Sequence, residues 1–310
     1  MSDQGDNNFI THIYRGVEGE FIPRWATHIT VAEGVTVIRA DAFYEHPNII
    51  EIICHEDVET IEHCAFYECP RLQRVIMPGV KLVCESAFYW CDALTDVECD
   101  KLEIIKGCSF EWCQSLRNIN LSSIRIVPER AFYGCGGMIE ANFSDKLERF
   151  DVSAFGACFS LERITIPLKD GLIGDDDIFM ACEDLVRVDL VEGELHKTIA
   201  ALHLEDWRND MNEEIDSINQ ILPNTYSGYY DDKWFNHDEG EKAQTIRSWI
   251  RSVLRRIAHY RAEHERLLIE AAETLQFILP QDIAMNNIVP FFELPVQTFE
   301  GEIEADGNDE

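Results

Sequence analysis

Six cysteines that recur at one spacing are the side chains of this sequence best suited to chemistry. Each lies three residues after a phenylalanine: Cys69, Cys91, Cys113, Cys135, Cys158 and Cys182, with His46 at the same place in the first copy. Thiolates bind zinc, but a zinc site needs four ligands that converge as a tetrahedron. Thiols at one repeated spacing lie instead in a line, so we predict structural thiols, no metal and no cofactor. Neighbouring thiols about 5 Å apart could still form disulfides under oxidation, because the two Cα atoms of a disulfide lie about 4.4–6.8 Å apart.

Basic residues cluster in a second region that could bind a ligand. The stretch from residue 242 to residue 266 has a net charge of +5, whereas the whole chain has a net charge of −32. The candidate contact residues are Arg247, Arg251, Arg255 and Arg256. Two interpretations stay open: these arginines pair with acidic residues of the same chain, or they contact an acidic partner, a phosphate or a lipid headgroup.

Motifs for catalysis are missing from the sequence. It contains no glycine-rich phosphate loop, no nucleophile elbow and no His-Glu-x-x-His pair. The acidic run from Gly174 to Asp177 is interpreted as a polar turn, with a cation site as the alternative. His264 falls within an apolar helical stripe, which is typical of a packing histidine. We therefore predict no catalytic residue and no enzyme.

The cysteines are positioned by a unit that the chain repeats seven times. The unit is marked by a phenylalanine after a small or branched residue, every 22 to 24 residues: Ala42-Phe43, Ala65-Phe66, Ala87-Phe88, Ser109-Phe110, Ala131-Phe132, Ala154-Phe155 and Ile178-Phe179. Such a short unit cannot bury its apolar face alone, so it must stack on its own copies. Nine and eleven residues after each phenylalanine, apolar residues alternate with polar ones, which predicts a half-buried strand. Each repeat then supplies a strand, a turn, a second apolar return and a compact Ala-Phe segment.

The unit reads V-x-x-I-x-x-x-A-F-x-x-C-x-x-L-x-x-I-x-L from about Val35 to Leu190, which resembles the BspA-type leucine-rich repeat. The resemblance implies an α+β repeat protein: a right-handed α/β or β superhelix with a parallel sheet on one face and phenylalanines stacked inside. It also implies a recognition surface, and the family's motif carries no catalytic residue. The repeats and the helical tail together are similar to repeat proteins of unicellular algae whose functions are largely undefined.

The outward positions of the predicted strands are the candidate partner-binding residues. Eight residues after each phenylalanine stand Glu51, Arg74, Asp96, Asn118, Glu140, Arg163 and Arg187, and ten residues after it stand Ile53, Ile76, Glu98, Asn120, Asn142, Thr165 and Asp189. We select as contacts the polar members Glu51, Arg74, Asp96, Glu98, Asn118, Asn120, Glu140, Asn142, Arg163 and Arg187. We expect Glu51, Arg74 and Asp96 to pair across neighbouring strands. A solvated sheet face and a polar surface for a protein ligand both stay open.

The two ends of the repeat array need caps. We assign residues 1–34 to an N-terminal cap and partial repeat, in which residues 10–25 form a hairpin and residues 28–31 a partial strand. The solenoid spans residues 35–192. Residues 193–297 form a helical region, with helices over about 199–222 and 241–279 that pack as an antiparallel hairpin against the last repeat. Residues 298–310 are predicted to be an acidic disordered tail.

Charge and cysteine usage limit the partners and the compartment. A charge of −32 repels nucleic acid and anionic membranes, and no apolar run approaches the roughly 20 residues that cross a bilayer. Eleven cysteines and an amino end without a secretory signal favour a cytoplasmic or nuclear location rather than secretion. We predict a protein-interaction module that binds on its strand face, with a helical tail for dimerisation or a second partner. The alternative is binding of an anion or an acidic partner by the arginine-rich helix.

Overall fold

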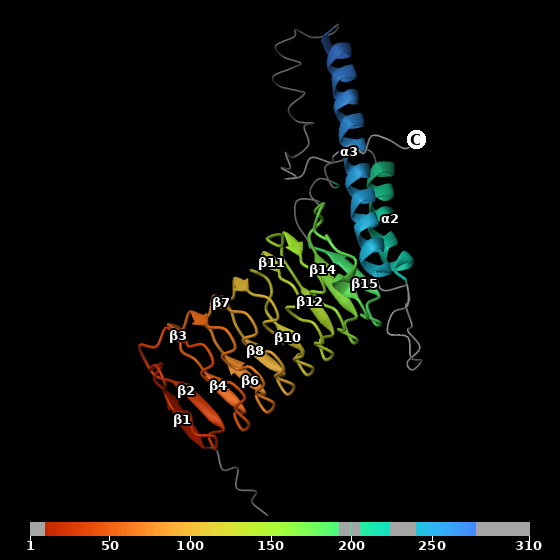
Figure 1. The fold of residues 1–310 in the computed structure, drawn as a ribbon. Helices are drawn as coiled ribbons and strands as arrows, with labels where there is room; N and C mark the ends of the chain where they lie inside the picture. The colour runs from red at the N-terminus through yellow and green to blue at the C-terminus, as the bar shows by residue number, and fades with distance from the viewer. Residues whose placement is uncertain (1–9, 192–198, 200–204, 224–239, 277–310) are drawn as a thin grey trace, which may run out of the picture.

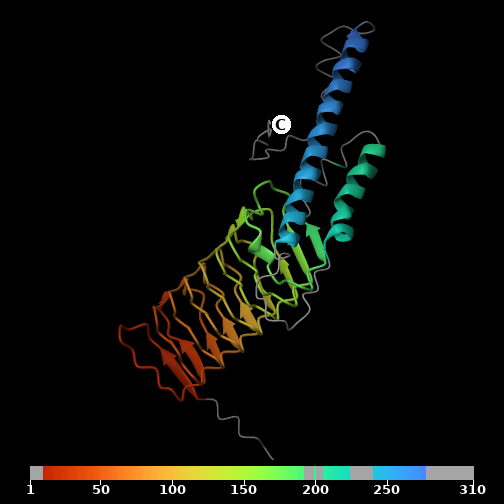
Figure 2. The same ribbon diagram turned by 45° about the vertical axis from the view of Figure 1, so that its right-hand side comes forward.

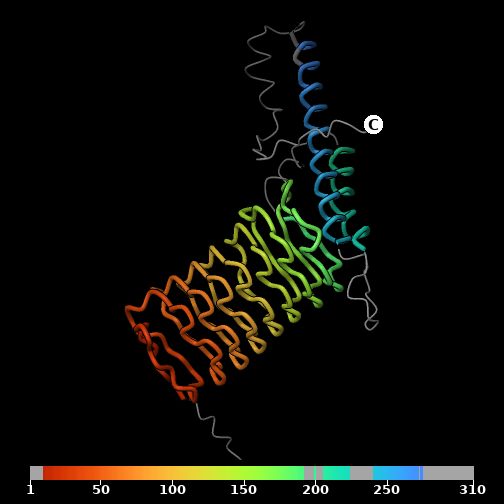
Figure 3. The backbone as a smooth tube through the Cα atoms, viewed as in Figure 1, coloured from red at the N-terminus to blue at the C-terminus, as the bar shows by residue number. Residues whose placement is uncertain are grey.

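Figure 1 shows a computed structural model of the chain as a ribbon, an elongated stack of coils with two helices at one end. The structure describes residues 10–191, 199, 205–223 and 240–276. Each repeat forms one coil of the stack, as the tube in Figure 3 makes plain. We name a repeat by its phenylalanine, so the Phe66 repeat is the coil that contains Phe66.

Parallel strands line one side of the stack and form the strand face. Six of them make one sheet, in the order β1 (Thr11–Tyr14), β2 (His28–Val31), β4 (Glu51–Ile53), β6 (Arg74–Ile76), β8 (Asp96–Glu98) and β10 (Asn118–Ile119). Three more, β12 (Glu140–Asn142), β14 (Arg163–Ile166) and β15 (Arg187–Leu190), make a second sheet. Partners lie one repeat apart, as Ile52 does from Val75, and both of these side chains are fully buried. The predicted strands and their inward residues are confirmed.

The second apolar return of each repeat also forms strands. They are two residues long: β3 (Val37–Ile38), β5 (Thr60–Ile61), β7 (Leu82–Val83), β9 (Ile104–Ile105), β11 (Ile126–Val127) and β13 (Arg149–Phe150). The first four pair in parallel, and β11 pairs with β13. The solenoid therefore has a second, narrow ladder that the sequence indicated only as an apolar stretch.

The Ala-Phe segment makes a third set of contacts between coils. Phe43 N donates to Ala65 O at 2.8 Å, and Glu45 N, two residues on, donates to Tyr67 O at 2.7 Å. Later coils repeat this pattern because the residues two before and two after the phenylalanine are left-handed, with φ of 55° at Asp41 and 49° at Glu45. The alternation of left-handed residues with residues of negative φ turns every second N–H toward the next coil.

The phenylalanines stack through the centre of the solenoid. From Phe43 to Phe88 the neighbouring ring centroids lie 4.9 and 5.1 Å apart, with interplanar angles below 10°. Each of the six cysteines that follow a repeat phenylalanine by three residues is buried beside this stack, and its thiol donates to the carbonyl of the phenylalanine one coil back. Cys69 Sγ, for example, lies 3.0 Å from Phe43 O. The stacked core and the structural role of the thiols are confirmed.

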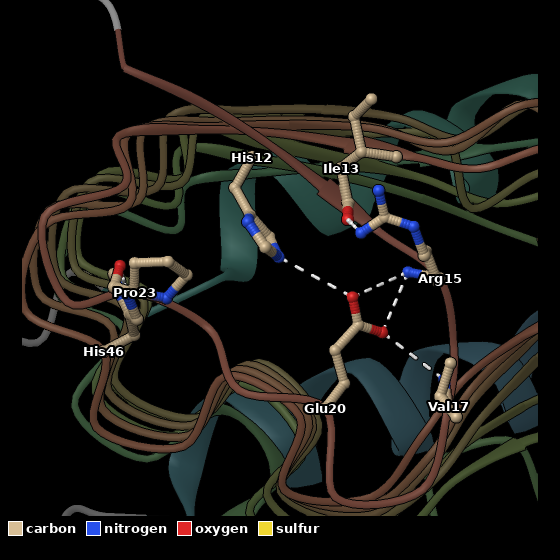
Figure 4. A network of polar contacts seen from close by, with 7 residues as sticks. All are labelled: His12, Ile13, Arg15, Val17, Glu20, Pro23 and His46. Carbon is tan, nitrogen blue, oxygen red and sulfur yellow. Dashed lines mark hydrogen bonds and ion pairs between the residues drawn. The ribbon is translucent and has the colours of Figure 1, made fainter.

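The first coil ends the stack with polar groups. Tyr14 covers Phe43 at 5.2 Å between ring centroids, and its hydroxyl accepts from Arg39 N at 3.1 Å, in place of the carbonyl that a preceding coil would supply. Figure 4 shows His12 and Glu20 pointing toward each other inside this coil, 3.6 Å apart. The predicted hairpin is wrong, because β1 is parallel to β2 and extends the strand face by one more rung.

Both strand ladders are interrupted at one junction, between the Phe110 and Phe132 repeats. β10 and β12 belong to separate hydrogen-bonded sheets, and so do β9 and β11. Pro128 supplies one cause. In the two preceding repeats the same position donates its N–H across the ladder, from Cys84 to Ile61 O and from Lys106 to Val83 O at 2.9 Å each, whereas proline has no N–H.

The phenylalanine side of this junction stays closed. Phe110 N donates to Ala131 O at 2.9 Å, although the rings of Phe110 and Phe132 are 5.6 Å apart, farther than the rings of the earlier coils. The carboxylate of Glu111, only 3% exposed, binds Arg130 of the next coil at 2.5 Å. The two parts of the solenoid are thus joined on one side and parted on the strand side.

Two helices follow the last coil. α2 (Glu205–Ile221) and α3 (Glu241–Gln276) lie side by side at the end of the stack in Figures 1 and 2. They are antiparallel: Trp207 stacks on Tyr260 at 5.0 Å between ring centroids, whereas Trp249 Nε1 donates to Glu214 O at 2.9 Å. The predicted antiparallel hairpin is confirmed, while the acidic tail, residues 298–310, lies outside the described residues. Within the described chain, no helix is both long and apolar enough to cross a bilayer.

Lys242 fastens this hairpin to the solenoid. Its ammonium group is buried and donates to Cys182 O at 2.5 Å and to Glu183 O at 2.8 Å, two carbonyls of the last coil. On α2, the side-chain oxygen of Asn219 accepts from Val188 N of β15 at 3.0 Å. The helices therefore cover the end of the stack, where a further coil would otherwise supply partners.

Candidate functional site: a cleft in the strand face

The ten partner-binding residues predicted from the strand columns all lie on the strand face. Each belongs to a strand of the main ladder except Asn120, which directly follows β10. Their side chains are exposed or half-buried, whereas the residue between each pair points inward. The structure separates them into three groups along the ladder: a charged group near β6, an amide-rich group around β10 and β12, and a charged group at β14 and β15.

The group near β6 is held by one arginine. Arg74 binds Glu51 at 3.3 Å and Glu98 at 2.5 Å, across the two neighbouring strands. The predicted pairing of Arg74 with Glu51 is confirmed. Its second partner is Glu98 rather than Asp96. Asp96 stands directly opposite Arg74 in the register and accepts instead from the hydroxyl of Thr95 at 3.1 Å.

The group at the far end is also internally paired. Arg187 binds Asp189 of its own strand at 3.0 Å, and Arg163 reaches the same carboxylate at 3.4 Å. These are half-exposed pairs, each worth about 0–1 kcal/mol. Both ends of the strand face thus present arginines that already pair with carboxylates of their own chain.

The middle group surrounds a cleft at the interrupted junction. Its volume is about 250 Å³, and its walls are Val97, Asn118, Ile119, Asn120, Glu140 and Asn142. Four of these six are predicted contact residues, so the structure brings them together. Ser122 donates to Asn120 Oδ1 through its N at 3.1 Å and its hydroxyl at 2.7 Å, while Thr165 donates to Asn142 Oδ1 at 2.8 Å. These bonds fix the two amide side chains at the mouth of the cleft.

The charged residues on the strands that line the cleft, β8, β10 and β12, are carboxylates, while Arg74 and Arg163 lie one strand further out on either side. Asp96 lies beside Asn118 in the register, and Glu140 lies on the opposite wall. Within the described chain neither carboxylate makes an ion pair, in contrast to Glu51, Glu98 and Asp189. The middle of the strand face is therefore the part that a cation would neutralise.

An apolar stripe on the same face was missed by the sequence reasoning. Ile13, Thr30, Ile53 and Ile76 stand opposite one another on β1, β2, β4 and β6. Ile13 is 48% exposed and Ile53 is 40% exposed, and Ile76 is half-buried. Ile53 and Ile76 were visible in the outward column, but the selection of contacts favoured polar residues. Ile13 joins them only because β1 is parallel to β2.

The arginine-rich helix is largely engaged by its own chain. Arg247 binds Asp176 at 2.8 Å, Arg251 binds Asp170 at 3.3 Å, and Arg256 binds Asp210 at 2.6 Å. Asp176 belongs to the acidic run after Gly174, so this run contacts α3. Arg255 is exposed and has no ion pair among the described residues. A contact between this helix and an acidic partner stays a prediction that rests on Arg255.

The cysteines form no reactive or metal-binding centre in the described chain. All eleven are free thiols, and no group of three or more histidine, cysteine or acidic side chains could hold a metal ion there. Burial raises the pKa of Cys54 to about 12 and that of Cys99 to about 11. Burial, with a hydrogen bond to Glu111, raises the pKa of Cys108 to about 12. These thiols are protonated at neutral pH and poor nucleophiles.

Comparison with solved structures finds bacterial leucine-rich repeat proteins. A leucine rich cell surface protein of Faecalibacterium prausnitzii A2-165 is 19% identical, with a TM-score of 0.35 over 54% of this chain and 60% of that chain. The T. pallidum leucine rich repeat protein is 16% identical, with a TM-score of 0.35 over 63% and 84% of the two chains. A leucine-rich repeat protein from Bacteroides ovatus ATCC 8483 is 18% identical, with a TM-score of 0.31 over 60% and 64%. This chain therefore spans less than two thirds of the first and third of these proteins.

Comparison with curated proteins finds no match. A family model described as the BspA type leucine rich repeat region, with six copies, matches residues 25–100 and 81–196. Together these segments cover more than half of the 310 residues, and they contain every coil from the Phe43 repeat to the Phe179 repeat. The chain belongs to the BspA-type leucine-rich repeat family.

Proposed function

We propose that this protein is a non-enzymatic interaction module that binds a partner protein across its strand face. The observation that carries the proposal is the cleft between β10 and β12, which opens in the middle of that face. It is lined mainly by polar side chains, and the carboxylates Asp96 and Glu140 beside it make no ion pair among the residues that the structure describes. Solenoids of stacked repeats commonly present such extended surfaces to protein ligands.

A binding role fits the chemistry of the described chain better than catalysis does. Catalysis needs a nucleophile, or an acid and a base with shifted pKa values, held in a pocket. The cleft holds amides and one carboxylate, and the buried thiols have raised pKa values. The free thiols also fit the expected cytoplasmic or nuclear location.

The helical tail supplies a second contact, with another copy of this chain or with a second partner. α3 continues for about 16 residues beyond Tyr260, where α2 begins beside it, a length of about 24 Å. Leu267 is 38% exposed and Ile269 is 60% exposed on this extension. Light scattering on the full chain and on the Leu267→Glu/Ile269→Glu double variant tests dimerisation. Equal masses at 50 μM would rule out a dimer through this surface.

Partner recovery by the full-length protein tests the strand face. Immobilised wild type, Asn142→Arg and Thr36→Arg are compared as baits in lysate from cells that express the protein, and the retained proteins are quantified by mass spectrometry. Asn142 lies at the cleft, whereas Thr36 is exposed ahead of the second ladder. We expect at least one protein to be retained by wild type and Thr36→Arg and lost with Asn142→Arg. Equal recovery by all three baits would contradict the proposal.

A further inference from the structure

We infer that the cleft accepts one lysine or arginine side chain of an extended partner segment, whose apolar side chain about four residues away packs on Ile53 and Ile76. This inference rests on the proposed function, because it specifies the partner of the same strand face. It commits to a cationic and apolar segment that crosses the strands along the solenoid.

The sign of the charge follows from the ion pairs of the face. Arg74 pairs with both Glu51 and Glu98 on one side of the cleft, and Asp189 pairs with both Arg163 and Arg187 on the other. Between these pairs, Asp96 and Glu140 make no ion pair within the described chain, because the arginines opposite them in the register, Arg74 and Arg163, bind other carboxylates. A cation placed over Asn118 approaches both carboxylates, whereas an anion there meets two like charges. The net charge of −32 favours approach of the same class of partner.

The size of the cleft selects a side chain over a strand or a small molecule. Inserting a strand between β10 and β12 would require about 9–10 Å between them, twice the usual strand spacing. Cα atoms of these two strands still lie within 8 Å of each other. The volume of about 250 Å³ is also below the roughly 300–1,000 Å³ of typical small-molecule sites.

The spacing between the two contacts follows from the ladder. Ile76 lies on β6, and the cleft lies past β8 and β10. At about 4.8 Å between strands, the distance from β6 to the middle of the cleft is about 12 Å. An extended segment covers this distance in about four residues at about 3.3 Å each. The exposed Ile53 and the half-buried Ile76 thus give the segment an apolar contact at a defined distance from its cation.

The test uses the full-length protein and three short peptides. The probe is acetylated, amidated Leu-Ser-Ser-Ser-Arg-Ser; the second peptide has glutamine for arginine, and the third places arginine directly after leucine. Binding is measured from the backbone amide shifts of labelled protein. We expect saturable shifts at Ile119, Asn142 and Ile76 with the probe, no shift at the cleft with the glutamine peptide, and weaker binding of the third peptide.

Matched variants locate the cation. Glu140→Gln and Asp96→Asn each remove one carboxylate beside the cleft, and we expect each to weaken the probe about three- to five-fold, as for an exposed ion pair. Glu103→Gln removes an exposed carboxylate ahead of the second ladder, and we expect it to leave the affinity unchanged. Equal affinity for the arginine and glutamine peptides, or no saturable binding of the probe, would overturn the inference. The proposed function then still stands or fails on the loss of partner recovery by Asn142→Arg.

Discussion

At the scale of the residue, one hydroxyl sets the Phe110 repeat apart from its neighbours. Ser109 takes the place that alanine occupies in five of the seven repeats. Its side chain is fully buried, and its hydroxyl has no hydrogen-bond partner among the described residues. A buried polar group without a partner costs about 1–3 kcal/mol.

Ser109→Ala is therefore expected to stabilise the protein by about 1 kcal/mol. Alanine matches Ala87 and Ala131 in the adjacent coils and removes the unpaired hydroxyl. Chemical denaturation of wild type and variant measures the change in unfolding free energy. The control is Ser86→Ala, the same substitution at a half-buried serine, which should change stability by less than about 0.5 kcal/mol. A loss of stability in Ser109→Ala would contradict the prediction.

His46 of the Phe43 repeat is expected to make the amino-terminal end of the solenoid less stable in acid. Burial lowers its pKa, partly offset by the hydrogen bond with Pro23 O at 3.1 Å. Below the ordinary histidine value of about 6.5, the unfolded chain therefore binds more protons than the folded one, so stability falls as the pH falls. His46→Cys, which installs the residue of the other repeats, should make the decline from pH 6.5 to pH 5 shallower. Parallel declines in wild type and variant, measured by denaturation at several pH values, would show that His46 has no such effect.

Most of the residue-level roles were predictable because seven copies can be aligned. The alignment predicts the phenylalanine stack, the cysteines and the outward columns without coordinates. It cannot predict which residue Arg74 selects, because Asp96 and Glu98 both lie within reach of a flexible side chain. The choice of Glu98 depends on rotamers, which repeat spacing does not determine.

At the scale of the element, continuity of the second ladder depends on one backbone N–H in each repeat, at the position of Pro128. Pro128→Lys restores the N–H that Lys106 supplies one coil earlier, so we expect the new amide at residue 128 to bond to Ile105 O. Hydrogen exchange should then show this amide protected to about the same degree as that of Lys106. Rapid exchange at residue 128 would mean that the junction is held open by other contacts. Pro78→Lys, at a proline outside the interrupted junction, controls for the general effect of removing a proline.

The helical hairpin should depend on Lys242. Lys242→Met keeps most of the side chain but removes its terminal ammonium group, which leaves two carbonyls of the last coil without their donor. We expect a loss of about 2 kcal/mol, since hydrogen bonds to charged groups are worth about 1.5–3 kcal/mol each and removing a buried charge returns part of that. The matched control is Arg255→Met on the same helix, which should change stability by less than about 0.5 kcal/mol. Equal effects of the two variants in thermal unfolding would contradict this assignment.

The elements that the sequence failed to predict are short or lack a second copy. The strands of the second ladder have two residues, too few to show alternation. Residues 10–25 occur once, so no alignment could show that β1 continues the parallel ladder. The cleft had a visible signal, since Pro128 is the only proline at its position in the seven repeats. Its consequence still required the structure, because one missing donor does not say how many neighbouring bonds are lost.

At the scale of the whole molecule, acidic and basic side chains are distributed differently between the solenoid and the helical hairpin. The solenoid keeps carboxylates without an ion pair among the described residues, Asp96 and Glu140, at the middle of its strand face, whereas Arg247 and Arg251 of α3 bind carboxylates of the solenoid. The sequence predicted the excess of acid and the basic helix. It left open whether that helix serves the chain itself or a partner, because pairing between residues about 70 positions apart, such as Asp176 and Arg247, is set by the docking of the hairpin.

The parted junction also has a consequence for how the protein unfolds. Coils in a solenoid are coupled only to their nearest neighbours, so a weak interface divides the array into two cooperative blocks. One block runs from β1 to β10, and the other from β11 to the helices. Hydrogen exchange under increasing urea should release the amides of these blocks in two steps, with the boundary at the Phe110 and Phe132 repeats. A single step across all coils would mean that Glu111, Arg130 and the phenylalanine stack couple the blocks as tightly as intact ladders do.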